Sequence, residues 1–116
     1  ISDCLVGSEM CIRDSSPPAL LALPKIRESV GPNLPLIFDS GARSGEDIVK
    51  ALALGANFVM LGRPIMMAVA ASSEKGLNDY ISMLKEEIKV VMAQLGLKDL
   101  SKISGDVLYD DISTKL

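Results

Sequence analysis

Two short apolar segments separated by one helical segment constrain the fold of this chain more than any other feature. The first covers 34–38 (LPLIF) and the second covers 57–61 (NFVML). Each is brief, continuous and followed by glycine-containing polar residues, a pattern typical of a strand buried on both faces. The residues between them carry apolar side chains at helical spacing. We therefore expect an α/β fold built on a strand–helix–strand unit with parallel strands.

The helix between the two strands carries signals at both of its ends. Ser44 and Asp47 stand three residues apart, as in a capping box with Asp in place of Glu. Gly55 is suited to a left-handed stop at the C-terminal end. The apolar face of this helix consists of Ile48, Ala51, Leu52 and Gly55.

Further helices are expected on both sides of this unit. Ser15–Pro18 forms a helix entry, Pro24 makes the helix short or kinked, and Gly31–Asn33 stops it. Pro64 opens another short helix, and a long amphipathic helix follows it and ends at Gly96. The apolar stripe of the long helix consists of Leu77, Tyr80, Ile81, Leu84, Ile88, Val91 and Leu95.

Residues 1–13 differ in character from the rest of the chain. They show neither a strand period nor a helix period, and they lack the basic and apolar regions of a signal peptide. The string SDCLVGSEMCIRDS resembles the conceptual translation of a sequencing-library adapter. We therefore expect 1–13 to be non-native and 14–116 to be the genuine domain segment. Separately, we expect the protein to be cytoplasmic.

The composition excludes several classes of function. A formal net charge of −3 argues against a strongly basic nucleic-acid binder, and the apolar runs are too short to span a bilayer. The chain has no histidine, so an imidazole base or ligand is absent from it. Its two cysteines, Cys4 and Cys11, lack the spacing of a metal motif, so no metal site is expected.

The residues after the two strands suggest a site for an anion. Asp39-Ser40-Gly41-Ala42-Arg43 follows the first strand, and Gly62-Arg63 follows the second. The carboxyl ends of parallel strands meet at one edge, where glycines admit backbone amides and arginines offer forked donors to phosphate. The N-terminus of the helix at Gly45 is expected to add a positive dipole end. An ordinary strand-to-helix loop with a surface arginine remains the alternative.

The segments 35–56 and 59–64 resemble the FMN-dependent α-hydroxy-acid dehydrogenases and oxidases. The resemblance covers roughly 14–109 and implies the C-terminal portion of a (β/α)8 TIM barrel, incomplete, with its last two strands and flanking helices. It implies FMN as cofactor, held on its phosphate and ribityl side by Asp39, Ser40, Gly41, Ala42, Arg43, Gly62 and Arg63.

The resemblance also implies an activity, the oxidation of a small L-2-hydroxy acid to a 2-oxo acid by a homo-oligomeric enzyme. The family carries a His-Gly-Gly-Arg segment with the catalytic base, and this chain has no histidine. The 116 residues alone are therefore expected to be inactive. Alternatives are another phosphate-binding barrel, such as type 2 isopentenyl-diphosphate isomerase or IMP dehydrogenase, and a non-enzymatic module that uses the 77–95 stripe against a partner helix.

Overall fold

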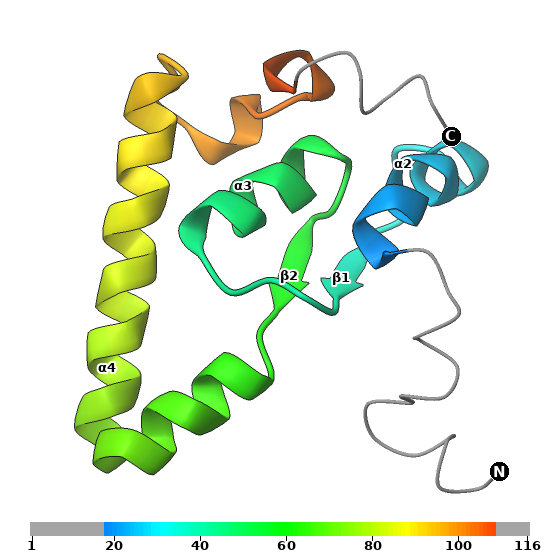
Figure 1. The fold of residues 1–116 in the computed structure, drawn as a ribbon. Coiled ribbons are helices and arrows are strands. Elements are labelled where there is room, and N and C mark those ends of the chain that lie inside the picture. Colours follow the sequence, from blue (N-terminus) through cyan, green and yellow to red (C-terminus); the bar gives the residue numbers. More distant parts are fainter. Residues whose placement is uncertain (1–17, 109–116) are drawn as a thin grey trace, which may run out of the picture.

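The computed structural model describes residues 18–108. Segment 1–13, both cysteines and the serines of the helix entry lie outside the described residues. The elements follow the order α2 (Ala19–Val30), β1 (Ile37–Asp39), α3 (Gly45–Ala53), β2 (Phe58–Met60), α4 (Arg63–Gln94), η2 (Leu100–Lys102) and η3 (Gly105–Val107) (Figure 1).

The predicted strand–helix–strand unit is confirmed. β1 and β2 pair in parallel, with Phe38 opposite Val59 and Asp39 opposite Met60. Both strands therefore end at the same edge of the two-stranded sheet, which we call the carboxyl edge. α3 connects them and lies between the strands and α4 (Figure 1).

The ends of α3 also follow the sequence signals. The Ser44 hydroxyl accepts a hydrogen bond from the Asp47 amide, and the Asp47 side chain accepts one from the Ser44 amide, which completes the capping box. At the other end Gly55 has φ +107°. The Gly55 amide donates to Leu52 and the Ala56 amide donates to Ala51, the pattern of a Schellman motif.

The sheet is buried on one face only, so the expectation of strands buried on both faces is wrong. Phe38 is 6% exposed and lies in the core with Leu23 of α2 and Ala51 of α3. On the opposite face Ile37, Phe58 and Met60 are 61%, 62% and 55% exposed. Both covering helices lie on the Phe38 side, and no element within 18–108 covers the other, which we call the bare face.

The buried face of α3 differs in part from the predicted one. Its buried residues are Gly45, Val49, Ala51 and Ala53, whereas Ile48, Leu52 and Gly55 are half-buried. The reason is that α3 contacts β2 on one side and α4 on another. A helix held from two sides buries more than one stripe, which helical periodicity alone does not reveal.

α2 and α4 match their predicted forms. α2 contains Pro24 and ends at Gly31. α4 is interrupted at Ser72 and Ser73, which have non-helical backbone angles, so it comprises the predicted short helix and the predicted long one. None of the helices in 18–108 combines the length and the apolar character needed to cross a membrane.

The long part of α4 packs its stripe inward. Leu84 is buried, and the other stripe residues are half-buried. Because α4 packs along α3, the stripe is used within the chain. This packing argues against the alternative in which the stripe is a free helix face that binds a partner helix.

Candidate phosphate-binding site

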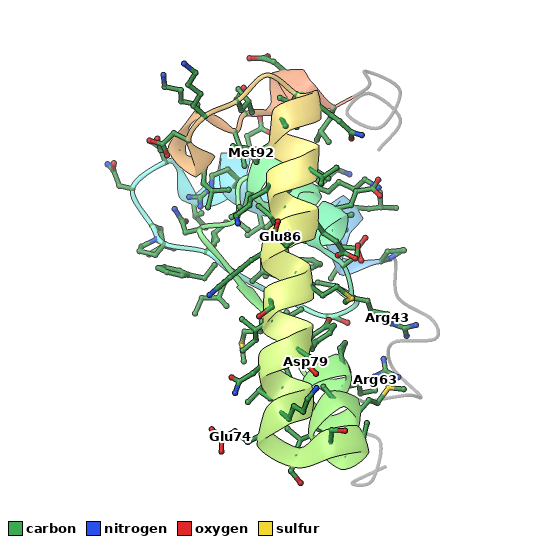
Figure 2. The ribbon with its side chains drawn as sticks, turned by 90° about the vertical axis from the view of Figure 1, so that its left-hand side faces the viewer. Arg43, Arg63, Glu74, Asp79, Glu86 and Met92 are labelled. Carbon is green, nitrogen blue, oxygen red and sulfur yellow. The ribbon has the colours of Figure 1, made fainter. Side chains whose placement is uncertain are left out.

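The two predicted loops leave the sheet at the carboxyl edge. Asp39 stands opposite Met60, two residues before Gly62. Figure 2 shows the side chains of Arg43 and Arg63 on the same side of the molecule. Both are exposed, and neither guanidinium group forms a hydrogen bond or ion pair with another residue of 18–108. The two cations are thus available at one edge.

The loop after β1 has an unusual backbone. Ser40 and Gly41 have φ values of +111° and +92°, in a region that favours glycine. No residue in the described part of the chain accepts a hydrogen bond from the Gly41 or Ala42 amide. A hollow of about 270 Å³ adjoins this loop and is lined by Pro18, Ala19, Leu20, Phe38, Ser40, Gly41, Ala42 and Asp47. Its size and unpaired amides suit a phosphate group.

Asp39 lies at the end of β1 on the bare face. Its side chain is exposed and makes no hydrogen bond or ion pair with another described residue. A role in fixing the loop through contacts within this chain is therefore not seen. Its place at the carboxyl edge leaves it facing the space beyond the sheet.

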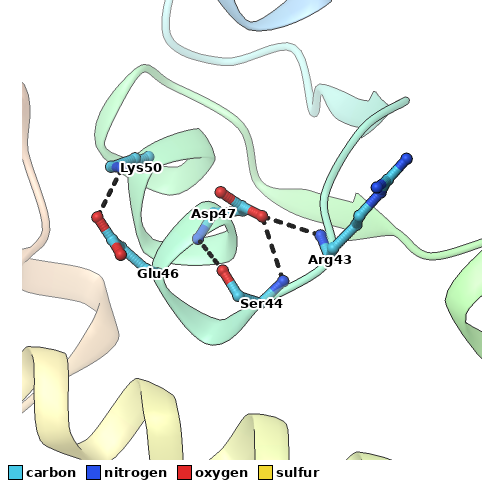
Figure 3. Close-up of polar contacts among 5 residues, drawn as sticks. All are labelled: Arg43, Ser44, Glu46, Asp47 and Lys50. Carbon is cyan, nitrogen blue, oxygen red and sulfur yellow. Dashed lines mark hydrogen bonds and ion pairs between the residues drawn. The ribbon is translucent and has the colours of Figure 1, made fainter.

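The N-terminus of α3 is already occupied by carboxylates, so its predicted role as a positive dipole end for phosphate is wrong. Asp47 Oδ2 accepts hydrogen bonds from the Arg43 and Ser44 amides at 3.0 and 3.2 Å (Figure 3). Glu87 Oε2, from α4, accepts one from the Gly45 amide at 2.6 Å. Burial raises the pKa of Asp47, but hydrogen bonds with Arg43 and Ser44 outweigh burial and bring that pKa below its ordinary value of 3.8.

The N-terminus of α4 has no such partners within 18–108. Its N-cap residue is Gly62, no described side chain caps it, and its first turn contains no acidic residue. A Cβ added at Gly62 would meet no atom within 4 Å. The uncapped positive end of α4, Arg63 in its first turn and Arg43 across the edge together offer an anion both fixed dipoles and charged donors.

Two further residues at this edge were not singled out from the sequence as site residues. The Tyr80 hydroxyl donates to the Arg43 carbonyl at 2.8 Å, and Glu87 accepts from Gly45. Burial raises the pKa of Tyr80, and the charges of Glu87 and Asp47 raise it further, so the hydroxyl remains a donor. Glu87 follows Glu86 in a run that is typical of a solvated helix face. No local pattern predicts that it reaches a residue 42 positions away.

Arg27 organises the opposite edge of the sheet. Its guanidinium group donates to the carbonyls of Gly31, Leu34 and Gly55 and to the Asn57 side chain, with donor–acceptor distances from 2.6 to 2.9 Å. A larger hollow of about 460 Å³ adjoins Arg27. All five of its N–H donors are used within the chain, so this hollow is not an anion site. A basic residue in the last turn of a helix is a capping signal that the sequence does offer.

The described residues contain no group of three or more potential ligands that could hold a metal ion. The donors at the carboxyl edge instead suit an anion such as phosphate, and comparison with known proteins gives their context. The sequence pattern of the family described as FMN-dependent dehydrogenase matches residues 12–110.

The chain belongs to the FMN-dependent dehydrogenases.

Relatives of this FMN-dependent dehydrogenase segment are oxidases and dehydrogenases. An L-lactate oxidase from Alicycliphilus denitrificans is 44% identical over 95 residues, which is 82% of this chain and 26% of that protein. The solved structure of (S)-mandelate dehydrogenase described as a monotopic membrane protein aligns with a TM-score of 0.78 at 38% identity, over 83% of this chain and 25% of that one. A flavocytochrome b2 variant with benzoylformate aligns with a TM-score of 0.79 at 31% identity, over 87% and 27%.

The chain thus spans about a quarter of the length of the proteins it matches. The fold is an incomplete portion of a (β/α)8 barrel, as predicted, and FMN is the cofactor of the family. The bare face accords with this assignment, since strands of such a barrel are covered by helices on one face and by other strands' side chains on the other. The match supports this family over the two other phosphate-binding barrels considered from the sequence.

Proposed function

We propose that the protein represented by this chain oxidises a small L-2-hydroxy acid, lactate- or glycolate-like, to the 2-oxo acid, and that residues 39–43 with Gly62 and Arg63 anchor the phosphate of FMN. The proposal rests on Arg43 and Arg63, whose guanidinium groups have no partner within 18–108 and lie on the same side of the molecule, and on the N-terminus of α4, which no described side chain caps. The 44% identity to an L-lactate oxidase supports the substrate class.

The role of this segment is to bind and orient. When bound, FMN supplies the two-electron acceptor for the oxidation of a hydroxy acid. Arg43 and Arg63 would donate charged hydrogen bonds to the phosphate. A Cβ at Gly41 or Gly62 would meet no atom within 4 Å, so the chain leaves space beside both residues for an approaching oxygen. Asp39 and Ser40 would face the ribityl side from the end of β1. None of these residues touches a proton of the substrate in this proposal.

Removal of the substrate's α-proton requires a base, and these 116 residues contain no histidine to provide an imidazole. We therefore propose that the segment is inactive by itself. The bare face supports this proposal, because Ile37, Phe58 and Met60 expose apolar surface that a complete barrel would cover.

Three further properties are proposed from the sequence. The complete enzyme is a homo-oligomer in the cytoplasm, and residues 1–13 are non-native. Light scattering of the complete enzyme tests the first, and cell fractionation tests the second. The structural relative described as a monotopic membrane protein makes membrane association the competing result. Resequencing the locus tests whether residues 1–13 are non-native. Recovery of the same codons in clean genomic reads would contradict that proposal.

The decisive experiment uses a hybrid barrel, in which the matching 95-residue segment of the Alicycliphilus L-lactate oxidase is replaced by the aligned residues of this chain. We expect the hybrid barrel to retain FMN through gel filtration and to oxidise L-lactate. The 116-residue chain, mixed with FMN and L-lactate, is expected to show no turnover. A folded hybrid barrel that binds riboflavin but shows no added affinity for FMN would contradict the proposed phosphate site.

A further inference from the structure

The long part of α4 contacts the backbone of the proposed phosphate loop through two polar side chains. Tyr80 donates its hydroxyl proton to the Arg43 carbonyl at 2.8 Å, and Glu87 accepts the Gly45 amide at 2.6 Å. They are seven residues apart, about two helical turns, and therefore lie on the same face of α4. Both bonds join segments about 40 residues apart in sequence, so they are tertiary contacts.

These contacts fix the peptide groups around Arg43 while leaving its side chain unused. The Arg43 amide is held by Asp47 and the Arg43 carbonyl by Tyr80. The side chain points away from the Asp47 carboxylate (Figure 3). The position from which the guanidinium group extends is thus set from two sides. A donor fixed in advance loses less conformational freedom when an anion binds.

We infer that Tyr80 and Glu87 are positioning residues for cofactor binding, which hold the Arg43 loop in the geometry that receives the FMN phosphate. This inference rests on the proposed function of the loop. It adds that affinity for the phosphate depends on side chains of α4 that do not contact the cofactor.

Packing of α4 on α3 does not itself require these polar groups. Leu84, between them on the same face, is 5% exposed and supplies apolar contact. At Gly45 the backbones approach so closely that an added Cβ would lie 2.6 Å from the Glu87 Cβ and 2.7 Å from the Ile88 nitrogen. Apolar side chains at 80 and 87 would serve packing equally well. The hydroxyl and the carboxylate are distinguished by their partners, which are backbone groups of the loop and of the first residue of α3.

The test compares FMN with riboflavin, which lacks the phosphate, in the hybrid barrel. Tyr80→Phe and Glu87→Ala are expected to weaken FMN binding about threefold to tenfold, the effect of losing one hydrogen bond. Riboflavin affinity is expected to stay unchanged in both variants. Glu87→Gln keeps an oxygen that accepts from Gly45, so it should restore most of the FMN affinity. Glu86→Ala, one residue away and paired with Lys89, is the matched control and should bind FMN normally.

Each result is assigned to one proposal. Equal losses of FMN and riboflavin affinity in Tyr80→Phe would indicate a general structural role and overturn the inference. Unchanged FMN affinity in both Tyr80→Phe and Glu87→Ala would also overturn the inference. If Arg63→Ala nevertheless weakened FMN binding, the proposed phosphate site would still stand. Unchanged FMN affinity in Arg63→Ala and Arg43→Ala would instead remove the phosphate site and the inference with it. If Glu87→Ala fails to fold, Tyr80→Phe, which deletes a single oxygen atom, decides.

Discussion

Helices α3 and α4 both begin at the carboxyl edge of the sheet, but their first amides have different partners. At α3, carboxylates of Asp47 and Glu87 accept the amides of Arg43, Ser44 and Gly45. At α4, the N-cap is Gly62 and no side chain of 18–108 caps the helix. Within the described chain, one helix start is therefore closed by the protein's own anions, and the other is open to the anion of the proposed site.

The difference teaches that a helix N-terminus is an anion site only when its amides are unpaired. Each helix has the positive end of its dipole at its N-terminus, and both follow a glycine-containing loop. What separates them is the presence of acidic side chains within hydrogen-bond distance. In this fold the closed start of α3 holds the Arg43 loop, and the open start of α4 carries Arg63 on the same side of the molecule as Arg43 (Figure 2).

The largest test of the comparison removes the charges at the open end. Arg43→Ala and Arg63→Ala in the hybrid barrel are expected to weaken FMN binding about 10- to 150-fold each, since a charged hydrogen bond contributes about 1.5–3 kcal/mol. Arg43→Lys should restore part of the loss, because lysine keeps the charge but not the fork. Flavin fluorescence titration measures the dissociation constants.

The matched control for the arginines is Lys50→Ala at the closed helix. Lys50 pairs with Glu46 at 2.6 Å on the exposed side of α3, and its loss should leave FMN affinity unchanged (Figure 3). An equal loss in Lys50→Ala would mean that the arginines act through overall charge alone.

The second test places the same methyl group at each helix start. Gly45→Ala would push a Cβ against Glu87 and the Ile88 backbone, and it should lower the free energy of unfolding by about 1–3 kcal/mol. The Cβ of Gly62→Ala would meet no atom of the chain within 4 Å, so the free energy of unfolding should stay the same. FMN affinity should fall about tenfold, because the added methyl group would keep the phosphate from approaching the backbone closely. Urea denaturation and FMN titration of the hybrid barrel measure the two effects. A reversed pattern would refute the assignment of the closed and open ends.

The third test uses pH at the closed end. Because the pKa of folded Asp47 lies below its ordinary value of 3.8, its carboxylate stabilises the fold above that pH, and this contribution is lost as the pH falls through the folded pKa. Asp47→Ala should cost about 1 kcal/mol of stability at neutral pH and abolish this part of the acid sensitivity. Urea denaturation at neutral pH and in acid, with Glu46→Ala as control, measures it. Identical acid sensitivity in Asp47→Ala and the parent would rule out the proposed cap linkage.

The smallest expected effect concerns the loop that faces the open end. Ser40 has φ +111°, where a side chain is strained. Ser40→Gly should relieve this strain and raise the free energy of unfolding by up to about 1 kcal/mol, the gain being reduced by the greater freedom of glycine in the unfolded chain. Denaturation of the hybrid barrel tests the sign, and a loss of stability would show that the serine side chain supports the loop.

Local signals predicted the parts of this fold that are built locally. The capping box of Ser44 and Asp47, the stop at Gly55 and the two short strands each depend on a few neighbouring residues. The predicted burial of both strand faces was wrong for this segment. An apolar run shows that both faces of a strand are suited to burial, whereas the described segment covers only one face. The α3 dipole was misassigned because Glu87, which closes it, lies 42 residues from Gly45. Three of the five hydrogen bonds of Arg27 were missed for the same reason, because they reach Gly55 and Asn57, 28 and 30 residues away, although its place in the last turn of α2 was visible.

The interruption of α4 at Ser72 and Ser73 makes the spacing of the two arginines depend on the angle between the two halves of the helix. Arg63 stands in the short half of α4, whereas the Arg43 backbone is tied to the long half through Tyr80. The two halves meet at the only part of α4 whose backbone angles are not helical, so the angle between them sets how far apart the two cations start. In the proposed site, a phosphate that contacts both arginines would bridge the two halves of α4, so its affinity and the angle between the halves would be coupled.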